Sequence, residues 1–318
     1  MSFSLIILGS SSAVPTIDRF PPAHLLNVDE RFYLIDCGEG VQMQLRRFGI
    51  RFGRINHIFI SHLHGDHVFG LFGLLSSFSL MGRLSDLNIY GPQSLEELLN
   101  AHFSFFNQER RYSINFHKLT GDTNKRIFED ERITVDAFPL RHSTQCYGFL
   151  FKEKEKLRNI RKEAITRYEI PIRAMMAIKQ GEDFVDVSGN IIPNEELTVP
   201  PPKPRTFAYC SDTMYFPALA RRVQGVDLLY HEATFLKKDH KLAQETMHST
   251  AYDAAVTAAN ANARHLVIGH FSTRYKTTEG FVKDALDVFP DVHEALDGFR
   301  YRIEQNGNLV VEPCREKK

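Results

Sequence analysis

The sequence has no tryptophan, few cysteines and no net charge, because its 39 basic residues are balanced by 39 acidic ones. The four cysteines form no CxxC pair, which argues against a disulfide framework or a thiolate zinc site; they are Cys37, Cys146, Cys210 and Cys314. No run approaches the roughly 18 consecutive apolar residues of a membrane span. The apolar start MSFSLIILG follows no basic segment, which favours a first β-strand over a signal peptide. We therefore expect a cytoplasmic protein with reduced thiols and no membrane partner.

The absence of net charge argues mildly against nucleic-acid binding unless positive charge is concentrated locally. Such a concentration occurs in the segment 152–205. Lys152 to Lys179 contains nine basic and four acidic residues, whereas Gln180 to Glu196 contains no basic and five acidic residues. The segment ends in VPPPKPR and departs from the pattern of the rest of the chain. We expect an inserted arm with a basic half, although a solvated helical hairpin or a dimer contact would have the same composition.

Six segments share one pattern, a short β-rich apolar run followed directly by Gly, Ser, His or Asp. They are RFYLIDCGEG, HIFISHLHGDH, ITVDAFPLRHS, RTFAYCSDT, VDLLYHEATF and HLVIGHFSTRY. In α/β folds, functional groups lie where strands end and loops begin, so these polar residues predict one shared cleft edge. Apolar residues at helical spacing predict helices at 40–48, 68–80, 94–106, 214–220, 251–261 and 278–289.

The densest motif is HLHGDH at 62–67, which places four potential metal ligands within six residues. An extended segment can direct His62 and His64 the same way, while Asp66 and His67 can face a second position at a turn into the next helix. Imidazole and carboxylate ligands without cysteine favour an open catalytic site for zinc, with manganese or iron also possible. A polar loop with merely hydrogen-bonded histidines is the less favoured interpretation.

Two metal ions need more ligands than this loop contains. Strand ends elsewhere in the sequence can supply them, in the form of His142, Asp212 and His270. Each of these residues taken alone is a weak candidate, because a single polar residue at a strand end is often structural. Together they complete a two-metal site.

These residues resemble the signature of the metallo-β-lactamase superfamily. The resemblance implies an α/β fold, an αββα four-layer sandwich that forms a single domain over 1–318 with the arm inserted at about 152–205. It also implies two zinc ions, each with three ligands of its own: His62, His64 and His142 for one, and Asp66, His67 and His270 for the other. Asp212 would bridge the ions, and Asp36 in LIDCGEG would support the histidines.

Members of this superfamily hydrolyse different substrates, so other motifs must distinguish them. HEAT at 231–234, HST at 248–250 and GHFSTRY at 269–275 resemble ribonuclease Z, as do GSSSAVPT at 9–16 and SDT at 211–213. The resemblance covers nearly the whole chain. It implies zinc-dependent endonucleolytic removal of the 3′ trailer from precursor tRNA, just after the discriminator nucleotide, which leaves a 3′-hydroxyl on the tRNA. It also implies a homodimer in which the arm, called the exosite, of one subunit holds the tRNA that the other cleaves.

Phosphodiester cleavage requires an activated nucleophile, stabilisation of developing charge and a proton for the departing oxygen. Glu232 and His248 can form a hydrogen-bonded pair that delivers this proton, and Asp66 can orient the nucleophile. A surface salt bridge for Glu232 and a helix-start position for His248 are the alternatives. Residues expected to contact substrate are Ser249, Thr250 and Arg274, with Lys152, Lys154, Lys156, Arg158, Arg161 and Lys162 of the arm. The remaining histidines are expected to be structural: His24, His57, His102, His117, His240, His265 and His293.

The sequence departs from the family in two places. The arm reads RYEIPIRAMMAIKQGEDF, in which Pro171 has no adjacent glycine, whereas bacterial arms usually carry a glycine-proline tip. RFPPAH at 19–24 also differs from the usual residues of the first loop. Two other functions therefore stay open. One is a small-molecule phosphodiesterase or aryl-ester hydrolase that needs no arm, and the other is a non-catalytic RNA-binding protein.

Overall fold

The computed structural model describes residues 2–106, 110–121 and 124–317. The chain divides into two compact units. The first, the catalytic unit, comprises Met1–Asp130, Thr134–Lys152 and Arg205–Lys318, and the second, the arm, comprises Glu131–Ile133 and Glu153–Pro204. Within the described ranges, none of the helices combines the length and apolarity that a membrane crossing requires.

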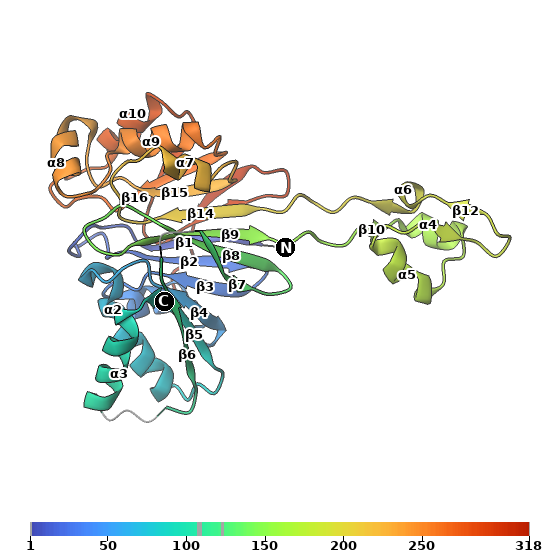
Figure 1. Cartoon of the computed structure of the whole chain (residues 1–318), viewed down its shortest axis with the longest axis horizontal. Helices are drawn as coiled ribbons and strands as arrows, with labels where there is room; N and C mark the ends of the chain where they lie inside the picture. The colour runs from blue at the N-terminus through green and yellow to red at the C-terminus, as the bar shows by residue number, and fades with distance from the viewer. Residues whose placement is uncertain (1, 107–109, 122–123, 318) are drawn as a thin grey trace. The chain divides into compact units, whose positions relative to one another are not determined.

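Two β-sheets, counted over the described residues, form the centre of the catalytic unit (Figure 1). In hydrogen-bonding order, the first sheet contains β19 (Leu309–Pro313), β18 (Phe299–Ile303), β1 (Phe3–Gly9), β2 (Ala23–Val28), β3 (Arg31–Ile35), β4 (Ile55–Phe59), β5 (Leu87–Pro92) and β6 (Ile114–Leu119). The second contains β17 (Val292–Glu294), β16 (His265–Gly269), β15 (Leu228–Glu232), β14 (Thr206–Cys210), β9 (Tyr147–Glu153), β8 (Ile133–Pro139) and β7 (Lys125–Glu129). Each of the six predicted strand segments forms a strand.

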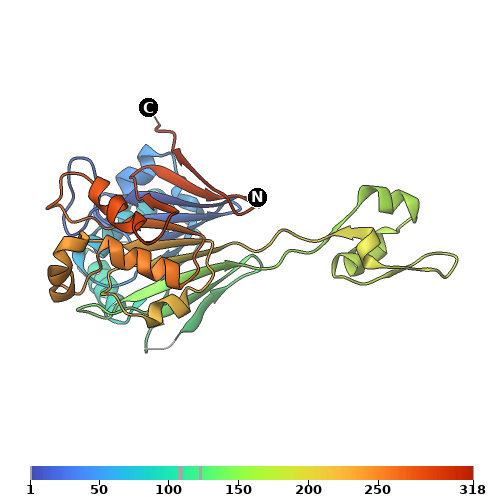
Figure 2. The same ribbon diagram turned by 90° about the horizontal axis from the view of Figure 1, so that it is seen from above.

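Helices cover the outer faces of both sheets (Figures 1 and 2). The first sheet is covered by α1 (Val41–Arg47), α2 (Gly65–Leu80) and α3 (Ser94–Phe106). The second is covered by α7 (Ala218–Arg222), α9 (Ala251–Asn260) and α10 (Glu279–Leu286). The 3₁₀ turns η1 (Phe52–Arg54) and η2 (Lys237–Asp239) and the short helix α8 (His240–Glu245) lie in the connections. This is the αββα sandwich that the sequence predicts.

One predicted helix is displaced. The sequence predicts a helix at 214–220, but α7 begins at Ala218. The Met214 amide donates to the carbonyl of Arg141, at 2.8 Å, so this residue is fixed to a loop of the β8–β9 connection and does not start the helix. The helix begins only after Pro217, which has helical dihedral angles.

The two sheets pack through an aromatic layer. In β4, Ile58 faces the helices on the outside, whereas Phe59 points inward and contacts Phe149 and Phe151 of β9, with ring centroids 5.5 and 5.3 Å apart. This alternation follows from the two-residue period of a strand. Burial of each such ring contributes about 1.5–3 kcal/mol. The layer therefore holds both sheets in a fixed arrangement behind the strand ends that carry the polar residues.

The arm has its own small core. Its pairs of strands are β10 (Asn159–Ile160) with β13 (Thr198–Val199), and β11 (Phe184–Val185) with β12 (Ile191–Ile192). Its helices are α4 (Lys162–Arg167), α5 (Ile172–Lys179) and α6 (Asn194–Leu197). The buried apolar side chains are Ala164, Ile170, Ile178 and Leu197. The arm leaves the second sheet after β9 and the chain returns at β14, and these two strands pair antiparallel with Lys152 opposite Thr206.

Candidate metal centre

The predicted metal ligands meet at one edge of the two sheets. The strands β3 and β4 are parallel, as are β14, β15 and β16, so their carboxyl ends deliver the following residues to the same edge. One group of potential ligands is formed by His62, His64, His142 and Asp212, and a second by Asp66, His67 and His270. In each group the ligand atoms lie within 4.8 Å of one another. The structure thus brings together all seven predicted ligands from distant segments.

Asp212 lies between the two groups. Its Oδ1 is 3.4 Å from Nε2 of His67 and 3.3 Å from Nε2 of His270, which belong to the second group. Its Oδ2 is 3.6 Å from Nε2 of His62 and 3.7 Å from Nε2 of His142, which belong to the first. The carboxylate is buried, and its Oδ1 has no hydrogen-bond partner among the described residues. A carboxylate in this position can serve two cations at once.

Two hydroxyl groups fix the orientation of His62 and His270. The Ser61 hydroxyl donates to Asp36 and lies 3.0 Å from Nδ1 of His62. The Thr234 hydroxyl donates to Glu232 and lies 2.8 Å from Nδ1 of His270. Because each hydroxyl proton is already donated, each hydroxyl oxygen must accept from the histidine N–H. Both imidazoles then direct the lone pair of Nε2 towards Asp212.

His67 and His142 are oriented in the same way. Nδ1 of His67 donates to Oδ2 of Asp36 at 2.8 Å, and Nδ1 of His142 donates to the carbonyl of Met247 at 3.0 Å. A hydrogen bond from one ring nitrogen leaves the other free to bind a metal, and such outer partners are the rule at metal sites. The donor set, with four oriented imidazoles, His64 and two carboxylates, therefore fits a divalent transition metal.

Asp36 is the main support of the site. It is completely buried and accepts hydrogen bonds from the Ser61 amide (2.8 Å) and hydroxyl (2.9 Å), from the Tyr209 hydroxyl (2.7 Å) and from His67. Its backbone is left-handed, with φ at 55°, and so is that of His270, with φ at 62°. Such a conformation is costly for these residues and is maintained only where the surroundings enforce it. The bends turn both side chains out of their strands into the site.

The carboxylates of the site are ionised. Burial alone would raise the pKa of Asp66, but the neighbouring His67 and His270 hold it well below its usual range. The pKa of Asp212 is likewise lowered, since His270 and His67 outweigh the effect of burial. The amide of Ala13 donates to Oδ2 of Asp66 at 2.8 Å and so fixes one carboxylate oxygen. The site concentrates negative charge that a divalent cation would neutralise.

Glu232 and His248 form a buried ion pair beside the ligand groups. Nδ1 of His248 donates to Oε1 of Glu232 at 2.9 Å, and Glu232 is completely buried. Burial would lower the pKa of His248, but the charge and hydrogen bond of Glu232 outweigh it and raise that pKa to about 9. The His248 ring centroid is 4.9 Å from that of His142 and 5.4 Å from that of His270. A protonated imidazole is thereby held next to both ligand groups.

Four further hydrogen bonds fix Glu232. Oε1 accepts from the amides of Thr213 and Ser249, both at 3.0 Å. Oε2 accepts from the Thr234 amide at 2.9 Å and from its hydroxyl at 2.8 Å. Hydrogen bonds to a carboxylate stabilise its charged form. Glu232 therefore stays ionised and cannot turn away from His248.

Comparison with known proteins identifies the family. Residues 3–158 match a family model described as Anti-Pycsar protein Apyc1, and residues 197–271 match one described as a Beta-lactamase superfamily domain. Ribonuclease Z of Bacteroides thetaiotaomicron is 46% identical over 288 residues, 91% of this chain and 91% of that one. Ribonuclease Z of Phocaeicola vulgatus is 43% identical over 302 residues, 95% of this chain and 98% of that one. The chain belongs to the ribonuclease Z family.

A solved structure of a related enzyme resembles this chain and supports the assignment to the family. The crystal structure of the human tRNase Z short form has a TM-score of 0.68 with this chain at 26% identity, covering 93% of this chain and 98% of that one. The chain is thus a nuclease of the metallo-β-lactamase fold, and its His and Asp clusters fit metal dependence.

Three residues that were expected to contact substrate, Ser249, Thr250 and Arg274, differ in exposure: the first two are buried and the third is exposed. Ser249 is completely buried, and its hydroxyl donates to the carbonyl of Thr213 at 2.7 Å. Thr250 is also buried and caps α9 through reciprocal bonds with Asp253. Their hydroxyls therefore stabilise the loop and helix behind His248. Arg274 is exposed, with its guanidinium 5.7 Å from the centre of the Phe235 ring, which in turn contacts His248.

The arm cations also differ from one another. Lys152 belongs to β9 and lies in the catalytic unit, whereas Lys154, Lys156, Arg158, Arg161 and Lys162 belong to the arm. Lys156 contacts Glu153 at 3.4 Å, and Nε of Arg158 donates to the Thr198 hydroxyl at 2.7 Å. Arg161 and Lys162 are exposed at the start of α4. Among the five arm cations that were expected to contact RNA, these last two are the exposed ones.

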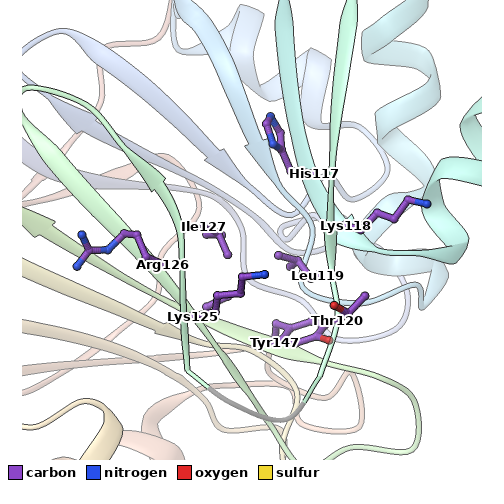
Figure 3. Close-up of a pocket in the computed structure, with 9 residues that line it drawn as sticks. His117, Lys118, Leu119, Thr120, Lys125, Arg126, Ile127 and Tyr147 are labelled. Carbon is purple, nitrogen blue, oxygen red and sulfur yellow. The ribbon is translucent and has the colours of Figure 1, made fainter.

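A separate pocket lies between β6 and β7. Figure 3 shows His117 and Leu119 of β6 on one side and Lys125 and Ile127 of β7 on the other. The pocket has a volume of about 230 Å³. None of its nine lining residues belongs to the ligand groups or to the Glu232–His248 pair. The pocket therefore contributes no residue to the candidate metal centre.

Apart from Asp36, the sequence did not indicate the residues that orient the ligands. Ser61 precedes His62 directly, and Thr234 ends the HEAT motif, so their positions next to functional residues are the available signal. Tyr209 gives no such signal, because its hydroxyl reaches Asp36 across 173 residues of sequence. Ala13 contributes only its amide, which any residue other than proline would supply.

Proposed function

We propose that this chain is a zinc-dependent endoribonuclease that removes the 3′ trailer from precursor tRNA. Cleavage occurs just after the discriminator nucleotide and leaves a 3′-hydroxyl on the tRNA. The observation that carries the proposal is the Glu232–His248 ion pair, 2.9 Å long, beside two ligand groups that share Asp212. Membership of the ribonuclease Z family and the likeness to human tRNase Z support it. The free cysteines fit a reducing compartment, the cytoplasm.

The metal roles follow from the two groups. We assign one zinc ion to His62, His64 and His142, a second to Asp66, His67 and His270, and the bridging role to Asp212, with Asp36 as the outer support. Zinc is preferred to magnesium or calcium because imidazole nitrogens dominate the donor set. When bound, zinc supplies Lewis acidity to the scissile phosphate and lowers the pKa of the attacking water.

The side chains of the site then supply orientation and a proton. Oδ2 of Asp66 accepts from Ala13, so we assign Asp66 to orient the attacking water along the line of the scissile bond. Nδ1 of His248 is bonded to Glu232, which leaves the Nε2 proton for donation. We assign this proton to the 3′ oxygen of the discriminator nucleotide as its bond to phosphorus breaks. This direction of protonation gives the 3′-hydroxyl end on the tRNA.

The arm supplies the proposed grip on the tRNA body. Exposed Arg161 and Lys162 at the start of α4 suit contact with phosphates, and the family implies a homodimer in which each arm serves the other subunit. Arg274, exposed on Phe235, is the proposed phosphate contact near the cleavage site. Ser249 and Thr250 position Glu232 and α9, and their direct contact with RNA stays a prediction.

The decisive experiment is cleavage of a 5′-labelled precursor tRNA by zinc-loaded protein, with mapping of the product ends. We expect a single cut after the discriminator nucleotide. His248→Ala should slow the single-turnover rate by about 10²–10³-fold with unchanged zinc content, because only the proton donor is lost. His240→Ala, an exposed histidine in α8, is the matched control and should behave as wild type.

Two outcomes would contradict the proposal. Zinc-dependent hydrolysis of bis(p-nitrophenyl) phosphate without any cleavage of tRNA would identify a small-molecule phosphodiesterase with the same site. Tight binding of precursor tRNA without hydrolysis of either compound would identify a non-catalytic RNA-binding protein.

A further inference from the structure

A second cluster of potential metal ligands lies at the opposite end of β16 from the catalytic site. His265 is the first residue of this strand, and the ligand His270 directly follows its last. At about 3.3 Å per residue, the two histidines are roughly 16 Å apart. Asp291 and His293, at the start of the neighbouring strand β17, complete the cluster, and the three ligand atoms lie within 4.8 Å of one another. The cluster is therefore separate from the catalytic groups.

The orientation of His265 leaves a buried nitrogen without a proton. Its Nε2 donates to the carbonyl of Gly307 at 2.8 Å, so in the neutral ring Nδ1 carries a lone pair. Nδ1 is buried and has no hydrogen-bond partner within the described part of the chain. Oδ2 of Asp291 lies only 3.0 Å from it, but outside hydrogen-bond geometry. Two electron-rich atoms in such proximity repel each other unless a proton or a metal cation lies between them.

The spacing of the three side chains suits a metal ion. Nε2 of His293 is 2.9 Å from Oδ1 of Asp291, close to the 3.0 Å between His265 and Oδ2. Ligands bound at about 2.1 Å in the tetrahedral geometry of zinc are separated by about 3.4 Å, so these side chains would need to move apart by only a few tenths of an ångström. Burial would raise the pKa of Asp291, but the neighbouring His265 and His293 outweigh it and lower that pKa, so the carboxylate is available as an anionic ligand.

The cluster opens into a surface pocket of about 510 Å³, lined also by Pro290, Asn308 and Leu309. The side chains of Asp291 and His293 are 44% and 36% exposed, so an ion can enter and water can complete its coordination. Two imidazoles and one carboxylate favour zinc or a similar transition metal over magnesium or calcium.

We propose that His265 Nδ1, the Asp291 carboxylate and His293 Nε2 bind a transition-metal ion of the zinc class at this second site. The ion stabilises the fold and takes no part in cleavage. His265 and Asp291 belong to the second sheet and its connections, whereas Gly307, which holds His265, lies in the turn between β18 and β19 of the first. The ion would therefore fix the His265 ring, whose other nitrogen is bonded to the first sheet. This assigns a ligand role to two histidines that the sequence left as structural.

The test compares the zinc content of the whole protein and its variants after equilibration with a zinc buffer and gel filtration. His293→Ala and Asp291→Asn should each contain one equivalent less than wild type, whereas His240→Ala should contain the same amount. The expected difference of one equivalent of zinc does not depend on how many ions the catalytic site holds. Cleavage rates should stay unchanged, which separates this site from the proposed function.

Thermal unfolding provides a second measurement. Zinc should raise the Tm of wild type by about 2–4 °C more than that of His293→Ala. The variant lacks the second site, so zinc bound there no longer stabilises its folded state. Circular dichroism at low temperature verifies that each variant is folded, and Asp291→Asn replaces His293→Ala if the latter is not. Equal zinc content in wild type and a folded variant would overturn the proposal and leave the cluster as a hydrogen-bonded group.

Discussion

The edge of the two sheets that carries the metal-ligand groups differs from the arm in how its charged side chains are buried and hydrogen-bonded. At the edge, Asp36 and Glu232 are completely buried, and each of their oxygens accepts at least one hydrogen bond from a fixed donor. In the arm, Arg161 and Lys162 are exposed, and the small core contains four buried apolar residues with partly buried ones packed against them. Bond cleavage requires groups fixed to within fractions of an ångström, whereas attraction of a polyanion depends mainly on the amount of charge. Single substitutions should therefore change RNA cleavage strongly at the edge and weakly in the arm.

The largest effect is expected for Asp212→Ala. Loss of the carboxylate that faces both ligand groups should reduce tRNA cleavage by about 10³-fold or more, because several kcal/mol of transition-state stabilisation depend on the metal site. Single-turnover kinetics and zinc content measured on the same preparation provide the test. Normal cleavage with full zinc content would show that Asp212 bridges nothing.

Glu232→Gln should have the next largest effect. In the proposed mechanism His248 must be protonated to donate, and Glu232 raises its pKa. Removal of the Glu232 charge should lower that pKa, so that His248 loses its proton at lower pH. We expect about 10²-fold slower cleavage at pH 8 and an alkaline limb of the rate–pH profile that moves to lower pH. Glu245→Gln, at an exposed position in α8, serves as control. An alkaline limb that does not move would show that Glu232 does not set the pKa of the proton donor.

Asp36→Asn tests the support beneath the ligands. An amide cannot accept all the hydrogen bonds that Asp36 accepts from Ser61, Tyr209 and His67. We expect zinc affinity to fall by about 10–100-fold, with cleavage partly restored at high zinc concentration. Competition with a chelator of known affinity measures the change, and the exposed Asp287→Asn should leave it unaffected.

The smallest effect is expected in the arm. Arg161→Ala with Lys162→Ala should raise the KM for precursor tRNA several-fold and reduce the slope of log KM against log salt by about 1–2, while kcat stays near wild type. Arg51→Ala with Arg221→Ala removes two exposed charges from the catalytic unit as a matched control. A large fall in kcat for the arm variant would mean that the arm also positions the scissile bond.

The strands and the predicted ligands could be located from sequence because four ligands lie in one motif after β4, and each of the other three follows a short apolar strand. Of the groups that orient them, Asp36 was expected from the family resemblance, whereas Tyr209 and the Met247 carbonyl were not, because these partners come from distant segments. Tyr209 reaches Asp36 only through the packing of two sheets, and His265 reaches the Gly307 carbonyl across 42 residues. Short helices were also missed, because the six residues of α8 are too few to establish a period.

The place where the arm joins the sheet has a consequence for how this chain can vary. Lys152 and Thr206 are paired across β9 and β14, so the 53 residues between them enter and leave at neighbouring points, as the loop of a hairpin does. Doubling the length of such a loop costs only about 0.6 kcal/mol in closure entropy. Insertions, deletions or an exchanged tip at this point should therefore alter which RNAs are held while the strands that carry Asp212 and Glu232 keep their register. The atypical arm tip of this chain is a change of this kind, with only a small effect on the free energy of loop closure.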